Sequence, residues 1–159
     1  MEFVKDSEEI LRHSFFLAMA EIEARKATCL KRKCGAVLEK DGKIIGRGFN
    51  SPPGNLESQR RCGLDKSSLD QKITDKSCCV HAEERAIMDA PKDRRRGSVM
   101  YFTSVGDDGH RLFSGEPYCT KCSKSALDAG VASWVLEHEE GIAIYGAEEY
   151  NDFSFSYRS

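Results

Sequence analysis

The sequence predicts one α/β domain built around a mixed β-sheet, and two features of its hydrophobic pattern carry that prediction. Early in the chain, two β-rich segments are joined by a tight-turn dipeptide, which makes the first two strands antiparallel. Later, helical and β-rich segments alternate, which is typical of parallel strands connected by helices. At 159 residues the chain is long enough for one domain with a substantial core and too short for two ordinary domains.

The first expected element is a helix over residues 7–27. Asp6 or Ser7 supplies the N-cap, and Glu8 and Glu9 place negative charge in the first turn, where the helix dipole favours it. Apolar residues then recur at helical spacing. We therefore expect one buried face, made of Leu11, Phe15, Ala18 and Ile22.

Two short strands are expected next, over residues 35–40 and 43–50. Asp41-Gly42 lies between them and accepts the positive φ angles of a two-residue hairpin turn. Residues 51–77 are polar and begin with a Pro-Pro-Gly run shortly after the second strand, so they predict a long insertion loop with room for a short helix. Loops of this length are usually functional or disordered.

The rest of the chain predicts helices and strands in alternation. One helix ends before Pro91, which cannot continue it, and the next ends at Gly130, a residue suited to the left-handed cap conformation. The tail over residues 141–159 is ambiguous between helix and strand. The other expected elements are a helix over 81–90, a strand over 98–103, a helix over 119–129 and a strand over 131–136.

The composition is that of a soluble globular protein, with 40% apolar residues, 31% charged residues and a formal net charge of -2. This balance makes a protein that wraps nucleic acid unexpected, although it allows a local phosphate pocket. The first residues lack the pattern of a signal peptide, and no segment is apolar enough to cross a membrane. We therefore expect a cytoplasmic protein whose seven cysteines are thiols or metal ligands rather than disulfides.

Two short motifs lie at the starts of two predicted helices. His81 and Glu83 open the first helix, and Cys119 and Cys122 open the second. The i,i+3 spacing places both sulfurs on one face of the first turn, where the helix dipole favours thiolates. Two thiolates and one imidazole suit zinc, and three protein ligands leave a fourth position for a water molecule. Glu83 is close enough in sequence to reach that water and is a candidate proton shuttle.

Neither motif is specific alone, because such short patterns often occur by chance. Both together, in this order and at two helix starts with a strand between them, reduce the coincidence to about 1%. The order H-x-E followed by C-x-x-C is the pattern of zinc-dependent base deaminases.

With these motifs, residues 14–135 resemble the cytidine and deoxycytidylate deaminase superfamily, and the hairpin segment over residues 28–54 resembles the deoxycytidylate (dCMP) deaminases in particular. The resemblance implies a cytidine deaminase-like fold, which is a three-layer α/β/α sandwich with a five-stranded mixed sheet. It also implies that Glu83 is the general acid and base. The zinc ligands that it implies are His81, Cys119 and Cys122.

The function that the resemblance implies is hydrolysis of dCMP to dUMP and ammonia, with Glu83 moving the proton from the attacking water to the ring and then to the leaving amine. Asn50 matches the asparagine that ends the second strand and contacts substrate in this superfamily. Arg32, in the basic run Lys31-Arg32-Lys33, is placed to meet a substrate phosphate, or else belongs to a solvated helix end. Family members generally form homo-oligomers, which we also expect here.

Two other functions remain open at this stage. One is deamination of a different base, such as guanine, or of adenosine or cytidine in nucleic acid. The other is a non-enzymatic zinc module in which Cys79 or another cysteine fills the fourth coordination position. Glu83 counts against that module, because a structural site has no use for a carboxylate aimed at an open position.

Other features of the sequence leave alternatives open. Some dCMP deaminases carry a second, structural zinc near this insertion, so the resemblance implies that Cys62, Cys78 and Cys79 either bind such an ion or are buried thiols. The loop over residues 105–116 is either a lid on the pocket or a solvated surface loop. Tyr118 and Arg85 replace the proline and asparagine that are common at these positions in the family.

Overall fold

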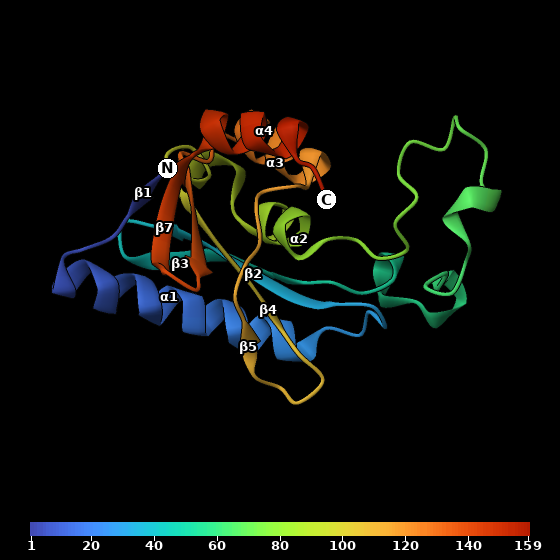
Figure 1. Cartoon of the computed structure of the whole chain (residues 1–159), viewed down its shortest axis with the longest axis horizontal. Coiled ribbons are helices and arrows are strands. Elements are labelled where there is room, and N and C mark those ends of the chain that lie inside the picture. Colours follow the sequence, from blue (N-terminus) through green and yellow to red (C-terminus); the bar gives the residue numbers. More distant parts are fainter.

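The computed structural model describes all 159 residues, which form a seven-stranded mixed sheet between two helical layers (Figure 1). Helix α1 (Ser7–Lys26) packs on one face of the sheet, and three shorter helices cover the other face. These are α2 (Ala82–Asp89), α3 (Thr120–Ala129) and α4 (Ala147–Ser156). The predicted three-layer α/β/α arrangement is therefore confirmed.

The sheet contains the four strands that were predicted by residue range, the strand β7 from the tail that was ambiguous, and two further strands of two residues each. The order is β1-β7-β6-β4-β2-β3, with β5 paired to β4, and the parallel pair is β4 with β6. The predicted number of five strands was too low because strands as short as β1 and β5 leave no period in the sequence. The bounds are β1 Glu2–Phe3, β2 Lys33–Lys40, β3 Lys43–Phe49, β4 Val99–Val105, β5 Arg111–Leu112, β6 Ser133–His138 and β7 Gly141–Gly146.

The hairpin of β2 and β3 forms as predicted. Asp41 and Gly42 have φ angles of 51° and 78°, the left-handed conformation that a two-residue hairpin turn requires, and they leave Lys40 opposite Lys43. Strand β2 is buried along almost its whole length, because α1 covers one side of it and α2 the other.

Helix α1 buries a different face from the one predicted. The four side chains expected in the core are exposed or only partly buried: Leu11, Phe15, Ala18 and Ile22. The buried ones are His13, Phe16, Leu17, Ala20, Glu23 and Ala24. A Cβ atom on Gly35 of β2 would lie 2.1 Å from the carbonyl oxygen of Ala20, so the strand and the helix backbone are in close contact. The helix face that carries Ala20 and Ala24 permits this close approach. The face that carries Leu11, Phe15 and Ile22 does not, because its side chains are large.

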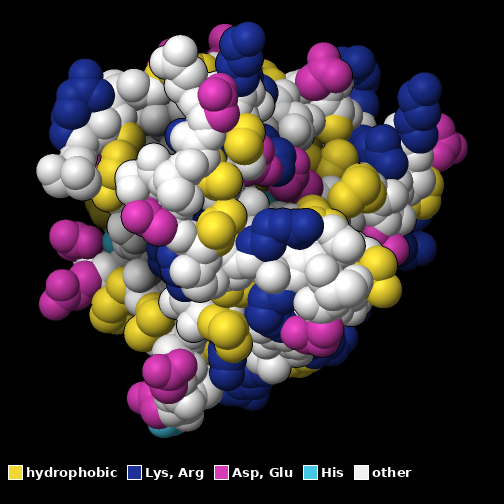
Figure 2. Space-filling view, turned by 90° about the vertical axis from the view of Figure 1, so that its right-hand side faces the viewer, with side chains coloured by type: hydrophobic (Ala, Val, Ile, Leu, Met, Phe, Trp, Pro, Cys, Tyr) yellow, Lys and Arg dark blue, Asp and Glu magenta, His cyan; other side chains and the backbone are white.

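The insertion over residues 51–77 extends beyond the end of the sandwich (Figure 1). It contains three single-turn 3₁₀ helices, η1 (Pro53–Asn55), η2 (Glu57–Gln59) and η3 (Lys66–Ser68). An isolated antiparallel bridge between Ser51 and Val80 brings its two ends together. Lysine and arginine side chains are numerous on the side of the molecule that carries this insertion (Figure 2).

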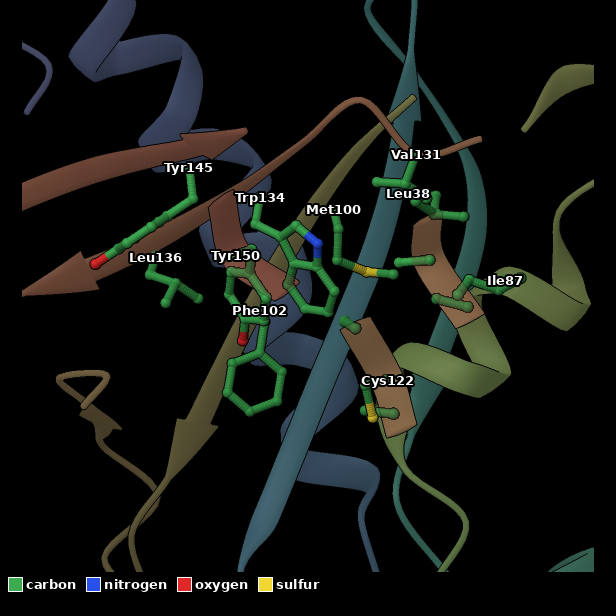
Figure 3. Packing of buried hydrophobic residues seen from close by; sticks show 14 of the residues in the cluster. Leu38, Ile87, Met100, Phe102, Cys122, Val131, Trp134, Leu136, Tyr145 and Tyr150 are labelled. Carbon is green, nitrogen blue, oxygen red and sulfur yellow. The ribbon is translucent and has the colours of Figure 1, made fainter. Parts of the chain in front are cut away.

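The tail that was ambiguous in the sequence forms both β7 and α4. Its Tyr150 stacks on Trp134 of β6, with ring centroids 4.0 Å apart and planes 10° from parallel. Figure 3 shows these two rings beside Phe102 and Met100 in the core between the sheet and helices α2, α3 and α4. None of the helices combines the length and the apolar character that a membrane span would need.

Candidate active site

The first turn of α2 is held directly against the sheet by a glycine in β3. A Cβ atom on Gly48 would lie 2.1 Å from the carbonyl oxygen of Ala82, so a side chain there would displace the helix. His81 is the N-cap of α2, and its backbone N–H donates to the carboxylate of Glu84 over 3.3 Å. The close packing and the cap fix the direction in which the His81 ring leaves the helix.

Cys119 is the N-cap of α3. Its sulfur accepts a hydrogen bond from the backbone N–H of Cys122 over 3.3 Å, an arrangement that favours the thiolate. At the other end of α3, Gly130 adopts the left-handed conformation with φ at 88°, so the predicted cap is confirmed.

The three predicted zinc ligands meet at one point. Nδ1 of His81 lies 3.3 Å from the sulfur of Cys119 and 3.1 Å from that of Cys122, and the two sulfurs are 2.8 Å apart. The Cys122 thiol and then the His81 ring hydrogen-bond to the sulfur of Cys119, and they lower its pKa to about 5 although burial opposes this. Two sulfurs and one imidazole nitrogen this close fit one zinc ion.

Glu83 lies beside this centre with its side chain 5% exposed. Burial raises the pKa of the Glu83 carboxyl to about 7, and negative charge at Cys119 adds to the increase. The donor that hydrogen-bonds to the carboxylate is the backbone N–H of Glu83 itself. The carboxylate therefore has acceptor capacity left for a ligand or a water molecule.

A pocket of about 160 Å³ opens beside the metal centre, and Glu83, His81 and Cys119 line it. Its other charged residues are all basic, and three of them come from the insertion. The five basic residues are Lys31, Arg32, Arg61, Lys66 and Lys76. One acidic side chain faces five cations, so the pocket is suited to an anionic ligand. The sequence did not single out the three cations of the insertion because nothing local connects them to the motifs at His81 and Cys119.

Asn50 and Arg32, the two predicted substrate contacts, both line this pocket. The Asn50 side chain accepts from the backbone N–H of Cys34 over 2.9 Å and donates to the carbonyl of Arg32 over 2.8 Å. It thus fixes the backbone from which the Arg32 side chain extends, and it keeps one N–H and one lone pair for a ligand. The Arg32 guanidinium donates to Tyr118 over 3.3 Å and to Ser104 over 3.2 Å.

Arg85, on the helix that carries Glu83, points away from the metal ligands toward the start of the insertion. Its guanidinium donates to the main-chain carbonyls of Phe49 over 2.9 Å and Pro52 over 3.0 Å, and also to the Ser51 hydroxyl. The charge also lies 5.8 Å from the centre of the Phe49 ring. Arg85 stands where the family commonly has asparagine, and its side chain joins the insertion to α2.

The loop over residues 105–116 is not a lid, because none of its residues lines the pocket. It folds back as β5 beside β4, and Arg111 forms salt bridges of 3.2 Å with both Glu21 and Glu137. The hypothesis of a lid is thus wrong, since these ion pairs hold the loop against α1 and β6.

Tyr150 also lines the pocket, and the sequence analysis missed it. The residue reaches the site from α4, in the segment that was ambiguous between helix and strand. Its hydroxyl has no hydrogen-bond partner in the protein, and unlike Nε1 of Trp134 it is not completely enclosed. It is therefore open to a ligand. No pattern in the sequence connects Tyr150 with the motifs at His81 and Cys119.

Comparisons with known proteins agree with this geometry. Residues 11–138 match the family model described as the cytidine and deoxycytidylate deaminase zinc-binding region. Deoxycytidylate deaminase of Schizosaccharomyces pombe is 32% identical over 121 residues, which cover 74% of this chain and 34% of the yeast protein. That of Saccharomyces cerevisiae is 27% identical over 123 residues, covering 77% and 36%. The chain thus spans about a third of the length of these two relatives.

Shorter and structural relatives were also found. Deoxycytidylate deaminase of Mycobacterium phage D29 is 27% identical over 131 residues, covering 79% of this chain and 93% of the phage protein. The crystal structure of dCMP deaminase from cyanophage S-TIM5 matches the fold with a TM-score of 0.56 and 20% identity, and 82% of each chain is covered. The family model spans both metal-binding motifs and most of the sheet. The chain therefore belongs to the cytidine and deoxycytidylate deaminase family defined by this zinc-binding region.

Proposed function

We propose that this protein is a zinc-dependent deaminase that hydrolyses dCMP to dUMP and ammonia. The observation that carries the proposal is the place of Glu83. Its buried carboxylate lies beside the three-ligand centre and inside a pocket whose other charged residues are basic. This arrangement brings together a proton carrier, a metal centre and the five basic residues of the pocket, which we call the basic rim.

The metal ligands in this proposal are His81, Cys119 and Cys122. A bound zinc ion would supply a Lewis acid that brings the pKa of a water molecule to about 7. The non-enzymatic alternative needs a fourth protein ligand, for which Cys79 was a candidate. The sulfur of Cys79 is instead grouped with those of Cys29 and Cys62, apart from the three-ligand centre.

Glu83 moves the protons in this mechanism. Its carboxylate accepts a proton from the attacking water and donates it to the ring nitrogen next to the carbon under attack. It then carries a second proton to the leaving amine, so that ammonia departs. Burial of Glu83 excludes bulk water from this path, and the small number of donors around its carboxylate leaves it free to make both transfers.

The basic rim favours a nucleotide over a nucleoside. A hydrogen bond between a cation and a phosphate is worth roughly twice a neutral one, so a site built with five cations gains most from a phosphorylated ligand. Arg32 is the proposed phosphate contact and Asn50 the proposed contact to the sugar or base. The relatives named deoxycytidylate deaminase and the cyanophage dCMP deaminase, whose structure was determined in complex with dCMP and dUMP, support the same substrate.

We also propose that the protein acts in the cytoplasm, as a homo-oligomer and without a nucleic-acid partner. The net charge of -2 supports the last point, because nucleic-acid binding draws heavily on positive charge. The exposed apolar side chains of α1, among them Leu11 and Phe15, offer a surface for a second copy. Sedimentation velocity at several protein concentrations tests the oligomeric state, and a monomer at all of them would contradict it.

The test of the activity is ammonia release from a panel of substrates at equal concentration. We expect dCMP to react about 10²-fold faster, or more, than deoxycytidine, because only dCMP carries the phosphate. Cytosine, guanine, adenosine and a cytidine-containing oligonucleotide complete the panel. A preference for a free base, a purine or the oligonucleotide, with dCMP inert, would overturn the substrate while leaving the deaminase chemistry in place. No release from any of them would overturn the activity.

A further inference from the structure

We propose that Tyr118 is a specificity-determining residue whose hydroxyl donates a hydrogen bond to the phosphate of the bound nucleotide. The inference rests on the proposed function, which makes the substrate a nucleotide and gives Arg32 as its phosphate contact. Tyr118 directly precedes Cys119 in the chain, at a position where the family commonly has proline. A proline side chain has no donor, so Tyr118 adds a hydrogen bond that the family pattern does not supply.

The side chain of Tyr118 extends from the metal centre to the basic rim. Its backbone is fixed at one end, because the next residue, Cys119, is a proposed zinc ligand and the N-cap of α3. At the other end, its hydroxyl oxygen lies 3.3 Å from Nη1 of Arg32. Tyr118, Arg32 and Glu83 all line the same pocket. A ligand in the proposed substrate site therefore meets the phenol beside the guanidinium.

The hydroxyl of Tyr118 has a proton to donate. A guanidinium group has five N–H donors and no acceptor, so the phenol oxygen is the acceptor in the contact with Arg32. This contact is the one hydrogen bond that the Tyr118 side chain makes within the protein. The residue is 47% exposed, so its O–H group is open to an acceptor that a ligand supplies.

A phosphate suits this pair of donors better than a neutral group. The Arg32 guanidinium donates to the hydroxyls of Tyr118 and Ser104 over 3.3 and 3.2 Å, which leaves three of its N–H groups for a ligand. A phosphate has three acceptor oxygens and a negative charge, so it can accept from both residues at once. A carbonyl of the base or a hydroxyl of the sugar has one oxygen and leaves the cation without a counter-charge.

Contacts at both ends hold the phenol in this position before a ligand binds. Its ring lies beside that of Tyr157, near the C-terminus, with centroids 5.7 Å apart and planes 48° from parallel. Its hydroxyl is held by Arg32, whose backbone carbonyl accepts from the Asn50 side chain over 2.8 Å. A donor that is already oriented loses little freedom on binding, so more of its hydrogen-bond energy contributes to affinity.

The other two aromatic residues of the pocket differ from Tyr118 in their packing. Phe102 and Tyr150 belong to the larger core cluster, where Figure 3 shows them beside Trp134. Tyr118 belongs to neither core cluster. Core packing therefore gives no reason for an aromatic side chain at this position, and a contact with the ligand gives one.

The phosphate is the same in dCMP and dUMP and takes no part in the reaction. Loss of a contact to it should therefore weaken the binding of substrate and product, raise KM and leave kcat almost unchanged. Deoxycytidine and deoxyuridine have no phosphate, so their binding should not depend on the hydroxyl. Tyr118 thus contributes to the choice of a nucleotide over a nucleoside rather than to the chemical step.

Isothermal titration calorimetry of the zinc-loaded protein with dUMP and with deoxyuridine tests the contact. We expect Tyr118→Phe, which keeps the ring, to bind dUMP about 10- to 10²-fold more weakly and deoxyuridine with unchanged affinity. Tyr157→Phe is the matched control, because it removes the same group from a ring outside the pocket, and it should bind both ligands as the wild type does. Unchanged affinity of the Tyr118 variant for dUMP, or an equal loss for both ligands, would overturn the inference.

A second comparison separates a direct contact from an effect that acts through Arg32. In the Arg32→Gln background, Tyr118→Phe should weaken dUMP binding further, since the phenol O–H reaches the phosphate itself. No further loss in that background would overturn the direct contact. Zinc content and melting temperature equal to those of the wild type establish that the variants are folded.

The result is distinguishable from a failure of the proposed function, because binding is measured instead of turnover. Ammonia release from dCMP by the wild type, together with dUMP binding that does not need the Tyr118 hydroxyl, would overturn the inference and leave the proposed function in place. A wild-type protein that is inert toward dCMP, but that loses affinity for dUMP with Tyr118→Phe, would overturn the proposed function and keep the phosphate contact.

Discussion

The guanidinium of Arg85 on α2 donates a hydrogen bond of 3.0 Å to the main-chain carbonyl of Pro52, at the start of the insertion. The helix that carries Glu83 is thereby joined to the segment that supplies Arg61, Lys66 and Lys76 to the pocket. We therefore expect replacement of Arg85 to affect substrate binding as well as the stability of the insertion.

Replacement of Arg85 should loosen the insertion. Arg85→Met keeps the aliphatic stem but removes the guanidinium that donates to the carbonyls of Phe49 and Pro52, which costs about 1–3 kcal/mol in the free energy of unfolding. We expect faster proteolysis within residues 51–77 and a higher KM for dCMP, measured beside Arg94→Met. Arg94 is exposed and makes no comparable contact, so its replacement should change neither quantity. Equal protease resistance in the two variants would contradict the role of Arg85.

Glu83→Gln should retain zinc and fold but lose at least ~10²-fold in kcat for dCMP, because the amide is nearly isosteric and cannot carry the proton. Elemental analysis and circular dichroism establish that metal and fold are intact. The control is Glu148→Gln, an exposed carboxylate on α4, which should have full activity. Normal turnover by the Glu83 variant would rule out the assigned proton transfer.

His81→Ala should lose one zinc ion per chain and all deaminase activity, because two sulfurs alone hold the ion weakly. Zinc content is measured on protein purified in parallel with the wild type. Unchanged zinc content would remove His81 from the metal centre.

Arg32→Gln should weaken the reaction of dCMP and leave that of deoxycytidine almost unchanged. The loss of one charge-assisted contact to phosphate corresponds to about 10- to 10²-fold in kcat/KM. The comparison between the two substrates isolates the phosphate, since general damage to the site would slow both. Lys124→Gln, an exposed cation on α3 outside the pocket, is the control. An equal loss for both substrates would contradict a phosphate contact.

Tyr150→Phe should lower kcat/KM for dCMP by about 10-fold while the melting temperature stays the same. The change removes a hydroxyl that faces the pocket but keeps the ring stacked on Trp134. Tyr145→Phe is the control. Its hydroxyl is hydrogen-bonded to His138 over 2.8 Å outside the pocket, so its replacement should lower the melting temperature and leave kcat/KM unchanged. Full activity of the Tyr150 variant would assign this residue to the core only.

Features determined by local chemistry could be predicted from the sequence. The hairpin at Asp41 and Gly42 follows from the turn that these residues adopt. The starts of α2 and α3 at His81 and Cys119 follow from residues in the first turn of each helix. For the hairpin and the two helix starts, the determining contacts lie within a few residues of one another. The meeting of the metal ligands was instead expected from the known pairing of the two motifs.

Features determined by distant contacts could not be predicted. Helix α1 has apolar residues on two sides, and the close approach of Gly35 decides which side is buried. Tyr150 reaches the pocket only because β7 and α4 return over β6. Cys29 joins the other thiols for the same kind of reason, since the end of α1 and the insertion are adjacent in space but not in sequence.

The separation of the proposed zinc ligands along the chain has a consequence for folding. His81 and Cys119 are 38 residues apart, and β4 is inserted into the sheet between them. Their meeting requires closure of a long loop, which is slower and entropically more costly than the local turn that joins the ligands of a zinc finger. We therefore expect the sheet to form before the ion binds, which would leave the thiols of a newly made chain unprotected until then.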